Sequence, residues 1–209
     1  MKKSTPMPKI FHKILFVLSL LAATVAQAQL SIEITGAGAN RIPVAIANFA
    51  GDTAAAQVVT ATVRADLERS GLFKLIDPAG ATLDENAQVN FADWKGRGAD
   101  ALAAGSVTRA PDGRMQARFR LYDTQKQVAL GGAVYVTGND QLRAAGHRIA
   151  DYIYEKLTGE KGVFSTRIAY VVKSGGQFRL QIADADGQGA VTALSSTEPI
   201  ISPVWSPDG

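Results

Sequence analysis

The pattern of apolar residues changes after Glu160-Lys161-Gly162. Before this point, two long segments repeat apolar residues every three or four positions, which is typical of helices with one buried face. After it, short apolar runs are separated by turns roughly every ten residues, which is typical of small antiparallel strands. We therefore predict a mixed domain over residues 41–160 and an all-β segment over residues 163–209.

Residues 1–28 have the pattern of a secretory signal peptide. Lysines precede an apolar run of about 12 residues, Ile14–Val25, and Ala26-Gln27-Ala28 places small residues at the cleavage positions. The run is shorter than the roughly 20 residues that span a bilayer. We expect cleavage after Ala28 rather than retention as an anchor, and a mature protein that begins at Gln29 outside the cytoplasm.

The positive charge of the chain belongs to this signal segment. The chain has 22 Lys and Arg against 19 Asp and Glu, and residues 1–28 hold four of the lysines and no acidic residue. The remaining 18 basic and 19 acidic residues give a net charge near −1, which removes the electrostatic argument for nucleic acid or an anionic membrane. The chain has no cysteine, which excludes disulfides, thiolate metal sites, a cysteine nucleophile and lipid attachment through cysteine.

Residues 41–160 are predicted to form an α/β domain with two helices on one face of a mixed sheet. Ile42–Phe49 is a β-branched apolar run that predicts one buried strand. A helix is expected from an N-cap at Asp52 or Thr53 to residue 70, followed by a strand at Leu72–Ile76. This strand–helix–strand order favours a layered α/β fold.

The rest of this domain is expected to be a three-stranded meander followed by a second helix. Asn139 or Asp140 is expected to cap that helix, and its apolar stripe ends at Gly159. The strands are predicted at Asp100–Thr108, Met115–Tyr122 and Val128–Val136.

Residues 163–209 are predicted to be the start of a β-propeller or a sandwich fragment. Strands are expected at Arg167–Lys173, Phe178–Ala183 and Ala190–Leu194, and Trp205 is expected in the core of a blade. A propeller needs at least four blades, which this segment cannot supply. We therefore expect the sequence to be part of a longer chain.

Several segments together resemble the TolB family, the soluble periplasmic components of the Tol–Pal system of Gram-negative envelopes. FSTRIAYV followed by SPVWSPDG is a rather specific pair of motifs, whereas WSPDG alone recurs in many propellers, including those attached to peptidases. The resemblance rests on the signal peptide, RADLERSGLF at 64–73, AGH at 145–147, EKLTG at 155–159, GVFSTRIAYVV at 162–172 and the terminal SPVWSPDG.

This resemblance implies an amino-terminal domain similar to the anticodon-binding domain of some tRNA synthetases, without tRNA binding, and the first blade of a six-bladed propeller. It implies no catalytic activity and no cofactor. Members of the family bind the lipoprotein Pal through the propeller and the C-terminal domain of the inner-membrane-anchored TolA through the first dozen mature residues. Pal binding withdraws that arm from TolA, and the system acts in outer-membrane constriction at division and in envelope integrity. The Pal-contacting residues are expected mainly beyond Gly209.

Residues 29–40 then correspond to a flexible arm whose first residues contact TolA. Leu30, Ile32 and Ile34 alternate as in a strand, and an extended segment can add to the exposed sheet edge of a partner. Alternatively, these residues form an edge strand on their own domain, and both states can exist if they differ by a few kcal/mol. The expected TolA contacts are Gln29, Leu30, Ser31, Ile32, Glu33, Ile34, Thr35 and Gly36.

Other motifs support neither catalysis nor a metal site. His147 is the only mature histidine, a zinc site needs three or four ligands, and no nucleophile elbow occurs, so we expect a packed or hydrogen-bonded helix residue near the domain joint. Asp184-Ala185-Asp186-Gly187 begins like a calcium loop but lacks the later Glu, and is expected to be a hairpin turn. Arg114, Arg118 and Arg120 are expected on a solvated strand face rather than in a nucleic-acid patch.

The leading functional prediction is a periplasmic scaffold that binds proteins and reaches membranes only through these partners. One alternative is an exported hydrolase in which a TolB-like propeller precedes a catalytic domain outside this sequence. Another is a periplasmic module that binds a small ligand, for which the sequence shows no convergent polar cluster.

Overall fold

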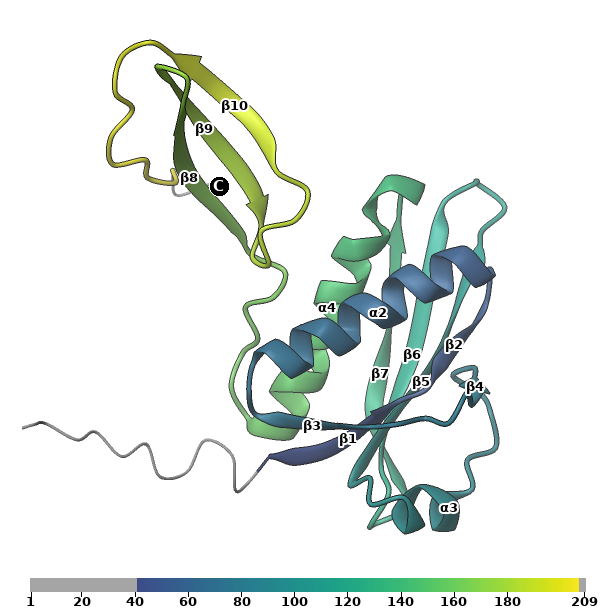
Figure 1. Cartoon of the computed structure of the whole chain (residues 1–209). Helices are drawn as coiled ribbons and strands as arrows, with labels where there is room; N and C mark the ends of the chain where they lie inside the picture. Colours follow the sequence, from purple (N-terminus) through teal and green to yellow (C-terminus); the bar gives the residue numbers. More distant parts are fainter. Residues whose placement is uncertain (1–40, 207–209) are drawn as a thin grey trace, which may run out of the picture. The chain divides into compact units, whose positions relative to one another are not determined.

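The computed structural model describes residues 41–206, so the predicted signal peptide and arm lie outside the described residues. The described chain contains a seven-stranded mixed sheet with its helices and a separate three-stranded antiparallel sheet (Figure 1). The first part comprises β1 (Ile42–Ile46), β2 (Asn48–Gly51), α2 (Thr53–Arg69), β3 (Phe73–Ile76), β4 (Thr82–Leu83), α3 (Phe91–Gly96), β5 (Ala101–Arg109), β6 (Met115–Asp123), β7 (Val128–Thr137), a 3-10 turn (Asn139–Gln141) and α4 (Leu142–Thr158). The second comprises β8 (Arg167–Ser174), β9 (Gln177–Asp184) and β10 (Val191–Ser196).

Parallel and antiparallel strands combine in the larger sheet. β1 pairs in parallel with β3 and β5, and β2 pairs in parallel with β4 and β5. β5, β6 and β7 form the predicted antiparallel meander. β1 and β2 precede α2, and β3 follows it and pairs in parallel with β1, so the predicted strand–helix–strand unit is confirmed.

The prediction of one strand over Ile42–Phe49 is wrong, because the backbone changes partner at Ala47. The Ala47 N–H donates to Ala103 O at 3.0 Å, and the Asn48 N–H donates to Ala81 O at 2.9 Å. The chain stays beside β5 on one side, while on the other side β4 replaces β3 as its neighbour, which divides the run into β1 and β2.

Both long helices form where their apolar periodicity predicts them. The Asp52 carboxylate caps α2 by accepting from the Ala55 N–H at 3.1 Å, and Gly159 ends α4 in the left-handed conformation. The expected cap at Asn139 or Asp140 is wrong. These residues belong to the 3-10 turn, in which the Gln141 N–H donates to Gly138 O, and α4 begins at Leu142 without a side-chain cap.

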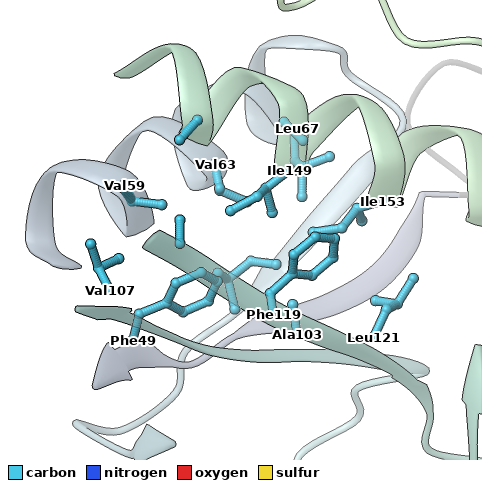
Figure 2. Packing of buried hydrophobic residues seen from close by; sticks show 14 of the residues in the cluster. Phe49, Val59, Val63, Leu67, Ala103, Val107, Phe119, Leu121, Ile149 and Ile153 are labelled. Carbon is cyan, nitrogen blue, oxygen red and sulfur yellow. The ribbon is translucent and has the colours of Figure 1, made fainter. Parts of the chain in front are cut away.

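Helices α2 and α4 cover the same face of the larger sheet and enclose the main core (Figure 2). A smaller core on the other face contains Trp94 of α3, Leu102 of β5 and Tyr122 of β6. The core residues labelled in Figure 2 are Phe49, Val59, Val63, Leu67, Ala103, Val107, Phe119, Leu121, Ile149 and Ile153. This packing fixes α2 against α4 along a shared buried surface.

The three-stranded sheet is a meander, β8–β9–β10, with a register shift between Thr192 and Leu194 and few fully buried side chains. Val191 is 67% exposed, and Trp205, expected in a blade core, is 44% exposed. The expectation for Trp205 is not met in this chain, because three strands bury little apolar surface and the ring packs against the Arg167 guanidinium at 5.4 Å. Within residues 41–206, no helix has the length and apolar character needed to cross a membrane.

Candidate functional site

The predicted TolA contacts, Gln29–Gly36, lie outside the residues that the structure describes, so this assignment stays a prediction. The described chain begins at Arg41, directly before β1. Because β1 lies between β3 and β5, the predicted arm precedes a strand that is hydrogen-bonded on both sides.

A group of charged side chains joins α2, α4 and the turn after β9, and all of it belongs to one compact unit of the chain. At its centre, His147 Nδ1 lies 2.6 Å from Asp66 Oδ2, and these side chains are 2% and 0% exposed. The other ring nitrogen, Nε2, lies 3.5 Å from Asp184 Oδ2 and 3.3 Å from Arg143 Nη2. We call these residues, with Arg69 and Asp186, the Asp66–His147 cluster.

Two arginines complete the cluster. Arg143 hydrogen-bonds to Asp186, and its Nε lies 3.6 Å from Asp184 Oδ2. Arg69 reaches Asp66 at 3.1 Å and Asp186 at 3.7 Å. Three carboxylates therefore face two guanidinium groups and one imidazole, and the charges balance when the imidazole is protonated.

The close crossing of the two helices allows Asp66 and His147 to meet. Asp66 adjoins the buried Leu67 of α2, and His147 follows Gly146 of α4, where a Cβ would lie only 2.7 Å from the Thr62 Cβ. A side chain at position 146 would push the helices apart, so the glycine sets their separation at the cluster.

The turn after β9 presents its two carboxylates together. The Asp184 N–H donates to Gln188 O at 3.0 Å, the Gln188 N–H donates to Asp186 Oδ1 at 3.0 Å, and Gly187 has a φ of 80°. Such a tight turn needs a residue that tolerates positive φ, and glycine does so without a steric cost. The predicted hairpin turn is confirmed, and so is the prediction of a hydrogen-bonded helix histidine at position 147.

The surroundings favour the charged forms of His147 and Asp186. Burial by itself lowers the pKa of His147, but the hydrogen bond and charge of Asp66, with the charge of Asp184, raise that pKa overall despite Arg143. Burial would raise the pKa of Asp186, but the Gln188 N–H and the Arg143 guanidinium lower it overall. The cluster is therefore a network of ion pairs.

The same geometry disfavours a metal ion. One ligand atom each from His147, Asp184 and Asp186 lies within 4.8 Å of the others. However, the Arg143 guanidinium hydrogen-bonds to Asp186 and lies 3.3 Å from His147 Nε2, so a positive charge already occupies this place. A protonated imidazole also has no lone pair for a metal.

A hollow of about 500 Å³ lies beside β2 and α2. Its polar side chains bind the chain itself: Arg64 donates to Ile46 O and to Asn48 Oδ1, and Thr60 Oγ1 accepts from the Phe49 N–H at 3.2 Å. These contacts hold β2 against α2 and explain the polar lining without a ligand.

The arginines near β6 have separate surroundings. Arg118 lies on the strand and hydrogen-bonds to Thr108 and Gln116, and Arg120 is exposed. Arg114 precedes the strand and pairs with Asp112 at 2.7 Å in the hairpin turn. The expected solvated strand face is thus found for Arg118 and Arg120, while Arg114 belongs to the turn.

The architecture is that of a two-part protein in which a mixed α/β domain precedes antiparallel strands of the propeller type. Residues 30–130 match the family model of the TolB amino-terminal domain, and residues 154–209 match that of the TolB beta propeller domain. The chain belongs to the TolB family.

Curated relatives and a solved structure agree with this assignment. A Tol-Pal system protein TolB from Dechloromonas aromatica is 77% identical over 97% of this chain and 48% of the relative, and one from Aromatoleum aromaticum is 60% identical over 88% and 43%. The chain thus spans about half the length of the curated relatives it matches. The crystal structure of TolB from Acinetobacter baumannii is similar with a TM-score of 0.72 and 36% identity, over 84% of this chain and 44% of that chain. The predicted fold class, an α/β domain followed by the start of a propeller, is confirmed.

Proposed function

We propose that this protein is a non-catalytic, protein-binding component of the Tol–Pal system in the periplasm. The observation that carries the proposal is the succession of both TolB domain models along one chain. The curated relatives from Dechloromonas aromatica and Aromatoleum aromaticum are Tol-Pal system proteins, and neither is named as a hydrolase. The signal-peptide pattern of residues 1–28 supports the periplasmic location.

Within this role, the amino-terminal arm binds the C-terminal domain of TolA and the propeller binds the lipoprotein Pal. The protein thereby links an inner-membrane-anchored partner to a peptidoglycan-associated one and acts in outer-membrane constriction at division and in envelope integrity. It contacts membranes only through these partners. The alternation of Leu30, Ile32 and Ile34 supports strand addition as the mode of TolA binding.

Calorimetric titration of a TolA C-terminal domain tests the role of the arm. Deleting residues 29–40 is expected to abolish binding, while the circular dichroism spectrum and the unfolding midpoint of the remaining protein stay the same. Unchanged affinity of the deleted protein would contradict the assignment.

A matched pair of variants tests the strand geometry. Ile32→Asp places a charge where an apolar side chain is expected to be buried, and should weaken binding by about tenfold or more, because burial of an isoleucine contributes roughly 1.5–3 kcal/mol. Ser31→Asp places the same charge on the opposite side of an extended chain and should weaken it much less. Equal losses for the two variants would argue against a strand with one buried face.

Pal binding is tested separately. Because the chain spans about half the length of its curated relatives, we expect residues 29–209 to bind Pal more weakly than a full-length TolB relative does. Tight one-to-one binding of Pal by residues 29–209 would contradict this expectation.

A further inference from the structure

We propose that the Asp66–His147 cluster is a proton-operated latch, which holds the turn after β9 on α2 and α4 while His147 is protonated and releases it when His147 loses its proton. This inference goes beyond the proposed function and does not depend on TolA or Pal.

The geometry of the ring carries the proposal. His147 faces a carboxylate at each nitrogen, with Asp66 of α2 at Nδ1 and Asp184 of the turn at Nε2. Only the doubly protonated imidazolium can donate from both nitrogens. In the neutral ring with the proton on Nδ1, Nε2 has no proton to donate to Asp184, and its lone pair can only accept from the Arg143 guanidinium at 3.3 Å, so the Asp184 carboxylate loses its pairing with the ring.

The charge balance of the cluster also favours the protonated ring while the turn is attached. Asp66 faces the ring from α2 and Arg143 faces it from α4, while two carboxylates face it from the turn, at positions 184 and 186. Arg69 of α2 pairs with Asp66 and Asp186. With His147 protonated, three positive groups meet three negative groups. After deprotonation, one negative charge is uncompensated beside the buried carboxylates of Asp66 and Asp186, which is unfavourable.

Asp184 is the most exposed carboxylate of the cluster, and a single backbone hydrogen bond, from the Ala185 N–H to Thr166 O at 3.0 Å, joins the turn to the segment before β8. Asp66 and His147 are held by the packed α2–α4 core, in which Val63 and Ile149 are fully buried. Asp184, in contrast, is 32% exposed. The least buried carboxylate therefore relieves the excess negative charge by moving into water.

The segment between α4 and β8 has its own attachment to α4, which does not depend on histidine. Asp151 accepts from the Phe164 N–H at 2.7 Å and from the Ser165 N–H at 3.0 Å. Release is therefore confined to the turn, and the Phe164 and Ser165 amides serve as internal controls.

The test combines two NMR measurements on the mature protein. The first follows the ring signals of His147 against pH, and we expect them to titrate above the ordinary value of 6.5. The second measures hydrogen-exchange protection of the Ala185 amide, which joins the turn to the segment before β8 by donating to Thr166 O at 3.0 Å, corrected for the intrinsic rise of exchange with pH. Across the pH range in which His147 titrates, this protection should fall about tenfold for each unit by which attachment of the turn to α2 and α4 raises the pKa of His147. Protection at Phe164 and Ser165 should stay constant.

Two variants separate the latch from a general loss of stability. His147→Gln keeps a donor for Asp66 but does not titrate, so the turn should exchange faster than in the unmodified protein and without the pH transition. If that variant does not fold, Asp184→Asn at the part-exposed end of the network should remove the transition. A His147 titration at or below 6.5 would overturn the proposal. Turn protection that stays constant across the titration, or falls together with that of Phe164 and Ser165, would overturn it equally.

Discussion

Gly146 of α4 packs directly against Thr62 of α2, where the two helices that the core joins lie close together. A Cβ built at Gly146 would lie 2.7 Å from the Thr62 Cβ and 3.1 Å from Val59 O. Gly146→Ala should therefore lower the free energy of unfolding by about 1–3 kcal/mol through overpacking, even though alanine favours a helix by about 1 kcal/mol. Urea denaturation measures this change.

Gly96→Ala is the matched control for this substitution. Gly96 ends α3, and a Cβ there meets no atom within 4 Å. The variant should unfold at the same urea concentration as the unmodified protein or a higher one. Equal destabilisation by the two substitutions would show that helical glycine, rather than the contact with Thr62, explains the effect.

Removing Asp66 should be among the most damaging single substitutions. Asp66→Ala leaves His147 and Arg69 without their shared carboxylate in a buried site, and such a loss costs about 3–5 kcal/mol. Asp112→Ala removes the carboxylate of an exposed pair with Arg114 and should leave the unfolding midpoint nearly unchanged. Similar midpoints for the two variants would contradict a large contribution of the buried pair to stability.

The stability of the protein should depend on pH in two separate ranges. The pKa of His147 is raised, so its contribution is fully present below the ordinary 6.5 and is lost as the pH rises through the raised value. The pKa of Asp186 is lowered, so its contribution is fully present above the ordinary 3.8 and is lost as the pH falls through the lowered value. The combined contribution is therefore largest between about pH 4 and 6.5.

Urea midpoints measured across pH test both limbs. His147→Gln should remove the alkaline loss and keep the acid one, whereas Asp186→Asn should do the reverse. A profile of the unmodified protein that is flat from pH 6 to 9 would contradict the assigned direction for His147.

In β2, the Phe49 N–H is hydrogen-bonded by the side chain of Thr60. Its Oγ1 accepts from the Phe49 N–H at 3.2 Å in a buried position. Thr60→Val keeps the shape but leaves this N–H without an acceptor, and should cost about 1–3 kcal/mol. Thr62→Val is the control on the same helix, because its hydroxyl only donates to the Val58 carbonyl one turn earlier, and it should cost less. A larger loss for the Thr62 variant would contradict this role of Thr60.

Local pattern was enough to predict the long elements. Val59, Val63 and Leu67 recur with the helical period and are fully buried, and Met115 and Leu121 face the core from alternate positions of β6. Periodicity succeeds for these elements because each of them buries one continuous face against a single core.

The sequence pattern did not predict where the first strand divides or where α4 begins. The change of neighbouring strand at Ala47, from β3 to β4, depends on where those two strands lie, and no residue type marks it. The side chains of Asn139 and Asp140 suit a helix cap, but the chain continues into a 3-10 turn before α4. In both places, neighbours remote in sequence or local backbone geometry outweighed residue preference.

The sequence by itself determined the export signal pattern, the order of an α/β domain and propeller strands, and the resemblance to the TolB family. It also identified His147 as a packed helix residue and Asp184-Ala185-Asp186-Gly187 as a turn. Only the tertiary structure decided that these two features form one charged cluster with Asp66. The reason is physical: Asp66 lies 81 positions from His147, and their contact depends on how closely two helices cross, which no local pattern encodes.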